Sequence, residues 1–545
     1  MPLMVLPWPA TAAIWWSQLC ERVNTCGDSG SDPMTSADSL LRTFAAVLAA
    51  VLFWLIVPPF GLHWLNWISL VPILWALRKE TPRANIRYGF IYGFFSIALL
   101  FQWVAETVAL FGDLPMVAAI GILALFAALF GAPYILIYAT VHPLRERLGV
   151  GWIAVTPAVA VLTEYLTSLV TLFPFQHGST LYRVPTLIQL ASITGVWGLT
   201  YLIYLVNCAL AEAIYRRREG NSVLPIAPWV ATALVLGAVL AFGTWRVGRV
   251  EAVLAEAPTV RIAQLQMKFS MIERLVRGAK WSLRKWVAAT RLIEPGSADI
   301  VVWSEAAYPY FLNETDDDTL AELAREGRFE LIVGAGAREP VPGTEDSGEF
   351  NAFNTVYFFD AAGQLVGRYN KMIPVPFGEY MPFGSIFPGL NDFVPTEGIY
   401  VAGDVPTVVE GAHLRVATPI CYEAIFGRVC NRFERPDILV NVVNDGWFGE
   451  SAATHQHAML AAIRATELGV PVFRAAYSGV SMVVEPHGVI RYETEPYTDV
   501  SRVVPVRIAK LDTVYGRLGD WFVVFCFGLL VGAVFVARRF TRLAP

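Results

Sequence analysis

Long runs of apolar residues lie on both sides of a segment of ordinary globular composition, and they constrain this chain more than any other feature. The runs concentrate before about residue 246 and again after Trp521. A helix that crosses a membrane needs about 20 mostly apolar residues, and several runs reach that length. Because 55% of the 545 residues are hydrophobic and 16% are charged, we predict a polytopic helical membrane domain. Buried helices of a soluble core are the less favoured alternative.

Eight membrane spans are predicted from these runs. They lie near residues 43–58, 60–77, 86–110, 116–141, 151–172, 187–215, 224–245 and 521–536. The first two are short and are separated by Pro58-Pro59. They therefore form either a tight helical hairpin or one span with a re-entrant piece.

The basic residues of the short loops predict the orientation, because loops rich in Lys and Arg stay in the cytoplasm. One side collects Arg78, Lys79, Arg83, Arg87, Arg145, Arg147, Arg216, Arg217, Arg218, Arg538, Arg539 and Arg542. The short loops of the other side carry only Arg183. Both termini are therefore expected in the cytoplasm and the segment after Trp245 outside, which in a bacterium means the periplasmic side of the inner membrane.

Four regions follow from this division. Residues 1–42 are an N-terminal extension, expected to be disordered or to precede the true start, with Met34 as a candidate initiator. Residues 43–246 hold the first seven spans, residues 258–507 a folded domain, and residues 519–537 the last span.

The segment 258–507 alternates between short β-rich runs and helical runs. Strands are predicted at 259–265, 299–303, 331–335, 354–359, 414–420, 438–444, 470–475 and 481–485, and helices at 273–289, 319–327 and 457–468. This alternation indicates an α/β or layered αββα domain with one core.

Cys421 is the candidate nucleophile of this domain. It ends a predicted strand, and the residues after it can begin a turn or helix; such an elbow exposes a nucleophile and directs backbone N–H groups at the reacting oxygen. A thiol needs a base or a cation nearby to react. Glu305 and Lys371 each follow a predicted strand, and strand ends converge. The alternatives are a disulfide between Cys421 and Cys430 and a solvated surface charge at Glu305.

Several motifs resemble those of a known family. They are Trp303-Ser304-Glu305, Asn370-Lys371, Pro374-Val375-Pro376-Phe377-Gly378-Glu379-Tyr380, Ile420-Cys421-Tyr422-Glu423, Asn444-Asp445-Gly446-Trp447-Phe448-Gly449, Arg464-Ala465-Thr466-Glu467 and Thr513-Val514-Tyr515-Gly516-Arg517-Leu518-Gly519-Asp520. The first four look like the Glu-Lys-Cys signature of the nitrilase (carbon-nitrogen hydrolase) superfamily. The whole set is similar to bacterial apolipoprotein N-acyltransferases, whose membrane half also fits Leu187-Ile188-Gln189-Leu190.

Together with the eight spans predicted above, this resemblance implies a periplasmic nitrilase-like αββα sandwich domain. It implies transfer of an acyl chain from a phospholipid, typically phosphatidylethanolamine, to the α-amine of the S-diacylglyceryl-cysteine that begins an apolipoprotein. Cys421 would carry a thioester, Glu305 would act as general base, and Lys371 would stabilise the oxyanion. No cofactor is implied, and a monomer in contact with membrane lipids is expected.

Three further residues match supporting positions of the family. Glu379 is expected to orient Lys371 or the base, and a surface ion pair is its alternative. Tyr422 and Glu423 are expected to shape the pocket, although Glu423 serves equally well as a structural hydrogen-bond acceptor. Trp447 and Phe448 line an acyl-chain path or simply pack. The segment 264–269 and Tyr477 depart from the family's pattern, which bears on the identity of the acceptor.

Other classes of function are less favoured. A net charge of -5 argues against a nucleic-acid partner. His455 and His457 lie close in sequence but have no cysteine or carboxylate at zinc-ligand spacing, so no metal is predicted. A membrane-tethered amidase, or an acyltransferase with a different amine acceptor, is the main alternative. A transporter or scaffold is disfavoured because Glu106, Glu164 and Glu212 are too few intramembrane charges for a relay.

Overall fold

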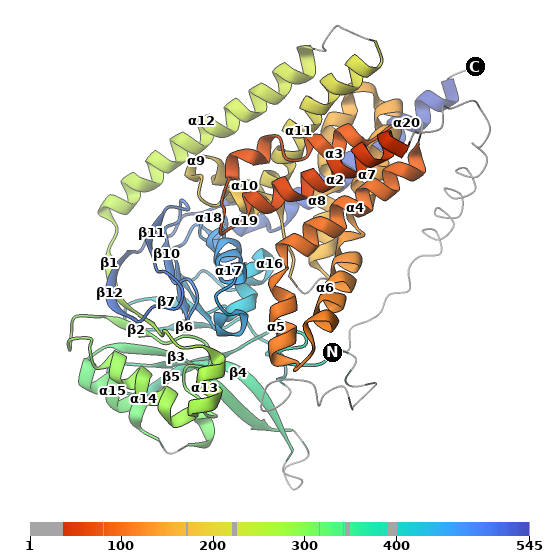
Figure 1. Ribbon diagram of the computed structural model, residues 1–545. Coiled ribbons are helices and arrows are strands. Elements are labelled where there is room, and N and C mark those ends of the chain that lie inside the picture. The colour runs from red at the N-terminus through yellow and green to blue at the C-terminus, as the bar shows by residue number, and fades with distance from the viewer. Residues whose placement is uncertain are drawn as a thin grey trace.

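A computed structural model describes residues 36–543 apart from short gaps. The gaps are residues 80, 171–172, 221–225, 316, 342, 344–348, 383, 385, 387–388 and 390–399. A bundle of helices forms one part of the molecule, and two β-sheets with their own helices lie at one end of it (Figure 1). Residues 1–35, most of the predicted N-terminal extension, lie outside the described residues.

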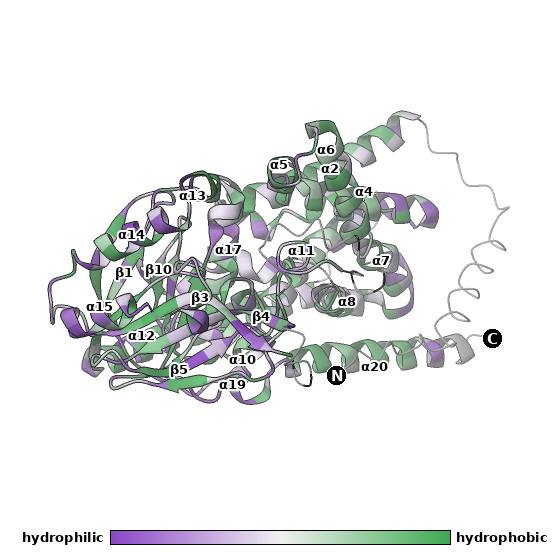
Figure 2. Cartoon of the chain, turned by 90° about the horizontal axis from the view of Figure 1, so that it is seen from below, coloured by the Kyte–Doolittle hydropathy of each residue, from purple (hydrophilic) through white to green (hydrophobic). Residues whose placement is uncertain are grey.

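The residues of the helical part are predominantly hydrophobic, whereas hydrophobic and hydrophilic residues are mixed in the part with the sheets (Figure 2). Its longer helices are α2 (Ser36–Ile56), α4 (Pro82–Leu100), α5 (Trp103–Phe111), α6 (Met116–Gly131), α7 (Tyr134–Leu148), α8 (Trp152–Ser168), α11 (Val196–Arg218), α12 (Ile226–Glu256) and α20 (Trp521–Leu543). Shorter helices α3 (Val71–Ala76), α9 (Pro185–Ile188) and α10 (Ala191–Thr194) connect them.

Five helical segments of the described chain are long and apolar enough to cross a membrane, and six if the bent pair α4 and α5 counts as one span. One of the five, Met116–Ser168, contains α6, α7 and α8, and α7 packs against α8. These helices fit the predicted membrane protein. The count of eight spans stays a prediction.

The second predicted span, residues 60–77, is not a continuous helix. It consists of the 3₁₀ helix η1 (His63–Trp67) and the six-residue α3. Asn207 of α11 satisfies the irregular backbone here, because its Oδ1 accepts from Leu70 N at 3.1 Å and its Nδ2 donates to Asn66 O at 2.8 Å. Irregular backbone is tolerated inside a membrane protein only where such partners exist, so the alternative of a re-entrant piece fits this segment better than a hairpin of two full spans.

Two helices extend beyond their predicted limits. Residues 36–42, expected to be disordered, form the first turns of α2. There the Arg42 guanidinium pairs with Asp38 at 2.8 Å and donates to the Ala76 carbonyl at 2.9 Å, which gives this turn a partner outside the helix. At the other side α12 continues past Trp245 to Glu256 and so reaches the domain with the sheets.

The second part contains two six-stranded sheets. One has the order β12-β1-β2-β3-β4-β5 and the other β11-β10-β9-β8-β7-β6. The strands are β1 (Thr259–Gln266), β2 (Ile300–Val302), β3 (Glu330–Pro340), β4 (Phe350–Phe359), β5 (Leu365–Asn370), β6 (Val408–Glu410), β7 (Arg415–Ala417), β8 (Ile438–Val443), β9 (Val472–Ala476), β10 (Met482–Val484), β11 (Ile490–Glu493) and β12 (Val500–Arg507).

Helices flank the pair of sheets to give four layers (Figure 1). On the first sheet lie α13 (Met271–Arg277), α14 (Ala279–Thr290) and α15 (Thr319–Gly327), and on the second α16 (Gly427–Cys430), α17 (Ala452–Ala462) and α18 (Arg464–Leu468). The eight predicted strands all have a counterpart. The strands that sequence patterns missed, β5, β6, β11 and β12, lie at or next to sheet edges and are only partly buried, so they lack the continuous apolar run of a central strand.

The helical part depends on one close approach between α4 and α6. A Cβ added to Gly93 would lie 2.1 Å from the Gly131 carbonyl oxygen, and one added to Gly131 would lie 2.5 Å from the Gly93 carbonyl carbon. Small residues at such a crossing allow two backbones to pack in contact within a membrane.

We therefore expect Gly93→Ala or Gly131→Ala to lower the thermal unfolding temperature of the detergent-solubilised protein, since α4 and α6 must move apart. Gly121→Ala on the same helix α6 is the matched control, because its added Cβ meets nothing within 4 Å. An unfolding temperature equal to that of the control would contradict this account of the crossing.

Candidate active site

Cys421 lies at a strained elbow between a strand and a short helix. β7 ends at Ala417, Ile420 forms one further bridge to Val442, and the 3₁₀ helix η6 (Cys421–Ile425) begins at Cys421 itself. The residue has a φ of 50°, a conformation that a residue with a side chain adopts only when its surroundings enforce it. The Asn441 side chain donates to its carbonyl at 3.3 Å. The elbow predicted from the sequence is therefore present.

Glu305 follows β2, and the residue after it, Ala306, has a strained backbone conformation. Ala306 has a φ of 51°. β3 lies close against this turn, because a Cβ on Gly334 would lie 2.6 Å from the Glu305 Cα. The carboxylate is buried and accepts from the Asn444 backbone N–H at 2.8 Å. The loop after β8 thus holds the carboxylate from one side.

Lys371 follows β5 and is 1% exposed. Its ammonium lies 3.0 Å from Glu305 Oε1 and 3.0 Å from Glu379 Oε1. Asn354 of β4 donates to the same two oxygens, at 2.7 and 2.6 Å. Glu379 also accepts from Val375 N at 2.6 Å and is buried, so it is not a surface ion-pair partner.

The thiol of Cys421 completes this group. Burial, followed by the charge of the Glu305 carboxylate, raises the pKa of this thiol well above the usual value, while the charge of Lys371 acts in the opposite direction. Burial acts against the charged form of Lys371, but Glu305 and Glu379 outweigh it and raise the pKa of the ammonium. The resting site therefore holds a neutral thiol beside a carboxylate and a permanent cation.

Glu423 supports the elbow rather than facing the reacting group. Its Oε1 accepts from the backbone N–H groups of Met372 and Ile373 at 2.6 and 3.1 Å, and its Oε2 accepts from that of Ile420 at 2.7 Å. The Tyr369 hydroxyl lies 2.9 Å from both oxygens. One side chain thus ties the segment after Lys371 to the residue before Cys421, which favours the structural alternative for Glu423.

The aromatic ring of Tyr422 faces the helical part. It contacts Phe173, which follows α8, with ring centroids 5.5 Å apart. Phe448 contacts Trp103 of α5 at 5.0 Å, and Trp447 contacts Phe111 of α5 at 5.0 Å. The aromatic residues beside the nucleophile and in the loop after β8 therefore meet the membrane helices directly.

Two family models match the chain. The apolipoprotein N-acyltransferase N-terminal domain matches residues 49–209, and the carbon-nitrogen hydrolase model matches residues 259–513. A protein of Geobacter metallireducens named apolipoprotein N-acyltransferase is 31% identical over 508 residues, covering 90% of this chain and 94% of that protein. One of the same name from Bradyrhizobium diazoefficiens is 31% identical over 514 residues, covering 88% and 92%.

This chain belongs to the apolipoprotein N-acyltransferase family. The two-sheet part is its carbon-nitrogen hydrolase domain, as the resemblance in the sequence implied.

The segment 264–269 and Tyr477, which both depart from the pattern of the acyltransferase family, lie together. Met267 N donates to Tyr477 O at 2.8 Å, and the rings of Phe269 and Tyr477 lie 5.2 Å apart. The Tyr477 hydroxyl is 3.1 Å from Ser282 Oγ on α14. The altered segment after Gln266 is thus packed against the altered residue, and both belong to the core beside the first sheet.

Sequence reasoning missed Asn354, the residue that joins the two carboxylates. It lies within the strand Phe350–Phe359. This strand carries two amides, Asn351 and Asn354, and the sequence alone does not show which of them faces the site. Cys430, considered as a disulfide partner of Cys421, is a free thiol, as is Cys421.

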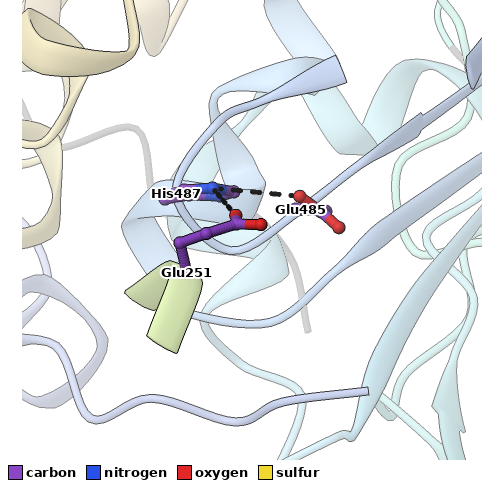
Figure 3. A group of neighbouring side chains, drawn as sticks. All are labelled: Glu251, Glu485 and His487. Carbon is purple, nitrogen blue, oxygen red and sulfur yellow. Dashed lines mark hydrogen bonds and ion pairs between the residues drawn. The ribbon is translucent and has the colours of Figure 1, made fainter. Parts of the chain in front are cut away.

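One group of described side chains is close enough to hold a metal ion: Glu251 of α12 with Glu485 and His487 of the β10–β11 turn (Figure 3). Arg491 lies 2.8 Å from Glu251 and 2.6 Å from Glu485, and Arg507 lies 3.1 and 2.6 Å from the same carboxylates. Two guanidinium groups already balance the two carboxylates. We therefore interpret this cluster as an ion-pair network that ties α12 to the hydrolase domain.

The two histidines considered for zinc lie elsewhere. His457 Nδ1 is 2.8 Å from Asp445 Oδ1, and Asp445 Oδ2 accepts from Arg474 at 2.7 Å. Within the described part of the chain, neither His455 nor His457 belongs to a group with metal-ligand geometry.

The first prediction for this site concerns the thiol. In Glu305→Gln the carboxylate that disfavours the thiolate is gone, so the pKa of Cys421 falls and more thiolate is present at neutral pH. Each unit by which the pKa of Cys421 falls should speed its alkylation by iodoacetamide about threefold. About tenfold more thiolate is present, but each thiolate is a weaker nucleophile. Mass spectrometry of the alkylated protein measures this rate.

Glu379→Gln is the matched control, because Glu379 bonds to Lys371 and not to the thiol. Cys421→Ala gives the background from the other cysteines. If Cys421 were alkylated more slowly in Glu305→Gln than in the protein without a substitution, the Glu305 charge would not be what raises the pKa of the thiol.

A second prediction concerns Glu423. In Glu423→Gln an amide NH₂ must face at least one backbone donor, and each buried donor left unpaired costs about 1–3 kcal/mol. We expect a lower unfolding temperature together with an altered rate of Cys421 alkylation. Burial raises the pKa of Glu423 to about 7, so the comparison is made above that pH, where its carboxylate is ionised.

Glu330→Gln is the control for Glu423. Glu330 is also a buried carboxyl whose pKa is raised by burial, but it lies at the start of β3, away from the elbow. Its replacement should change stability without changing alkylation of Cys421. Equal alkylation in both variants would mean that Glu423 does not hold the elbow.

Proposed function

We propose that this protein is a phospholipid-dependent N-acyltransferase that acylates the N-terminal S-diacylglyceryl-cysteine of apolipoproteins through a thioester on Cys421. The observation that carries the proposal is the buried group of Cys421, Glu305 and Lys371 at a strained elbow, next to aromatic residues shared with the membrane helices. Membership of the apolipoprotein N-acyltransferase family supports it.

In the first half-reaction Glu305 accepts the thiol proton while the Cys421 sulfur attacks the carbonyl carbon of the phospholipid ester. The carbonyl electrons move to oxygen, and the Lys371 ammonium, with a backbone N–H at the elbow, stabilises that oxyanion. As the intermediate collapses, the ester C–O bond breaks and the leaving oxygen takes the proton from Glu305. The products are a thioester and a lysophospholipid.

In the second half-reaction the α-amine of the acceptor attacks the thioester carbonyl in its neutral form. It loses a proton to Glu305 as the tetrahedral intermediate forms, and Lys371 again stabilises the oxyanion. The C–S bond then breaks, the amide leaves with the acyl chain, and the proton on Glu305 returns to sulfur. Every proton removed in one step is given back, so Glu305, Lys371 and Cys421 suffice without a cofactor.

The aromatic cluster supports a lipid donor rather than a small soluble one. Tyr422, Phe173, Phe448 and Trp103 are joined by ring contacts of 5.0 to 5.5 Å, and they connect the nucleophile's helix to α5. We propose that they line the path of the acyl chain from the membrane to Cys421. A polar donor would gain little from such a surface.

The remaining expectations belong to the same proposal. The donor is phosphatidylethanolamine, and the enzyme is a monomer in the bacterial inner membrane. The hydrolase domain lies in the periplasm with both termini in the cytoplasm, which the basic residues of the short loops support.

The prediction that tests the mechanism is an acyl adduct on Cys421. Purified protein incubated with phosphatidylethanolamine, without acceptor, should gain the mass of one acyl chain on the peptide that contains Cys421, and neutral hydroxylamine should remove it. The adduct should be absent from Cys421→Ala and unaffected by Cys430→Ala, which changes a buried thiol on the next helix.

An unmodified Cys421 in the presence of the donor would overturn the mechanism. An adduct that an apolipoprotein peptide fails to discharge, but water discharges, would instead favour the amidase-type alternative. Added diacylglyceryl peptide should therefore clear the thioester faster than buffer alone and appear as N-acylated product.

A further inference from the structure

Gln456 of the hydrolase domain bridges a break between two membrane helices. α4 ends at Leu100, α5 begins at Trp103, and the two are bent by 56°. Gln456 Nε2 donates to the Leu100 carbonyl at 3.0 Å, and Gln456 Oε1 accepts from the Trp103 indole N–H at 3.2 Å. The one side-chain amide therefore contacts both sides of the break.

The break leaves a polar group that needs this partner. In a continuous helix the Leu100 carbonyl would accept from Val104 N, but that N–H donates to Phe101 O at 2.9 Å instead. A carbonyl without a partner in an apolar surrounding is costly. Gln456 is 4% exposed, so its amide replaces the missing helical donor within the protein interior.

Trp103, the residue on the other side of the break, belongs to the aromatic cluster beside the nucleophile. Its ring lies 5.0 Å from that of Phe448 and 5.4 Å from that of Phe173, whose ring in turn contacts Tyr422 at 5.5 Å. The bond from its indole to Gln456 sets the direction of the ring plane. The orientation of one wall of the cluster thus depends on the hydrolase domain.

Gln456 is also rigidly connected to Cys421. It lies on α17, which packs against η6. The next residue, His457, bonds to Asp445, and Asp445 bonds to Arg474 at 2.7 Å. Arg474 donates to Asn441 at 2.8 Å, and Asn441 donates to the Cys421 carbonyl at 3.3 Å. All members of this chain are buried.

We propose that Gln456 is a positioning residue that holds α5 at a set place relative to Cys421, so that Trp103 forms a fixed wall for the donor acyl chain. This inference rests on the proposed acyl transfer. Glutamine suits the role because the break offers one acceptor and one donor, and a side-chain amide carries a donor NH₂ and an acceptor oxygen on separate atoms. Glutamate could accept from Trp103 but could not donate to Leu100, and methionine could do neither.

The main test compares Gln456→Met with Gln189→Met. Gln189 is a buried glutamine that also bridges the two parts, donating to His487 O at 2.8 Å and accepting from Arg246 at 3.0 Å. It directly follows α9, which packs against α12. Both variants remove one side-chain amide that joins the two parts. An effect seen only in Gln456→Met is therefore due to the lost bonds at the break between α4 and α5, and not to a general loss of contact between the parts.

Two readouts are used on the full-length protein in detergent. Hydrogen exchange of the α5 peptide Trp103–Phe111 should increase in Gln456→Met and stay unchanged in Gln189→Met, whatever reaction the enzyme performs. Acyl-enzyme formation from phosphatidylethanolamine should slow on the order of tenfold to a hundredfold, with the larger loss for long acyl chains, because a short chain does not need the whole wall.

Trp103→Phe is the second variant, in case Gln456→Met does not fold. It keeps a ring in the cluster but removes the indole N–H, and it should show the same dependence on chain length. Unchanged α5 exchange and an unchanged chain-length profile in either folded variant would overturn the inference. If the protein without a substitution forms no acyl-enzyme at all, the proposed function is overturned instead. The hydrogen-exchange result then still decides whether Gln456 holds α5.

Discussion

The site depends on an ammonium group buried between two carboxylates. Removing Lys371, Glu305 and Glu379 from water is expensive, and the ion pairs compensate only when the remaining hydrogen-bonding positions are filled. Here they are filled: Asn354 donates to both carboxylates, and backbone N–H groups of Asn444 and Val375 take the other oxygens. The result is an ammonium group fixed near a buried thiol whose pKa is raised. A reactive thiolate exposed to water would be far less selective.

Two side chains hold the elbow at Cys421, and a sequence motif does not show that either of them has a structural role. Glu423 ties Ile420 to the segment after Lys371, and Asn441 fixes the Cys421 carbonyl. The strained backbone of Cys421, with φ of 50°, is maintained by these contacts. At Ala306, whose φ is 51°, Arg274 donates to the carbonyl at 2.8 Å. Side-chain partners from other segments therefore keep both backbones in conformations that they would not adopt alone.

Much of this could be predicted from the sequence, and what could not has a common physical cause. The eight predicted strands and the convergence of Glu305, Lys371 and Cys421 follow from apolar runs that end in polar residues, which is local information. Asn354, Gln456 and the break between Leu100 and Trp103 could not be found, because each matters through a partner far away in the sequence. The helical start at Ser36 was missed for a related reason: Arg42 is stabilised by the Ala76 carbonyl, a contact that composition does not encode.

The two parts of the molecule meet through ion pairs at α12, and through aromatic rings and the uncharged amide of Gln456 at α5. At α12, the Glu251 network of ion pairs fixes the angle at which the hydrolase domain leaves the membrane helices. At α5, rings of Trp103 and Phe111 meet Phe448 and Trp447 without ion pairs among them. Charged contacts beside a lipid path would have to be desolvated whenever an acyl chain passed, whereas an apolar contact can exchange one hydrocarbon neighbour for another at little cost. In the proposed acyl transfer, the charges at α12 thus hold the hydrolase domain firmly, while the rings at α5 give the donor acyl chain an apolar surface.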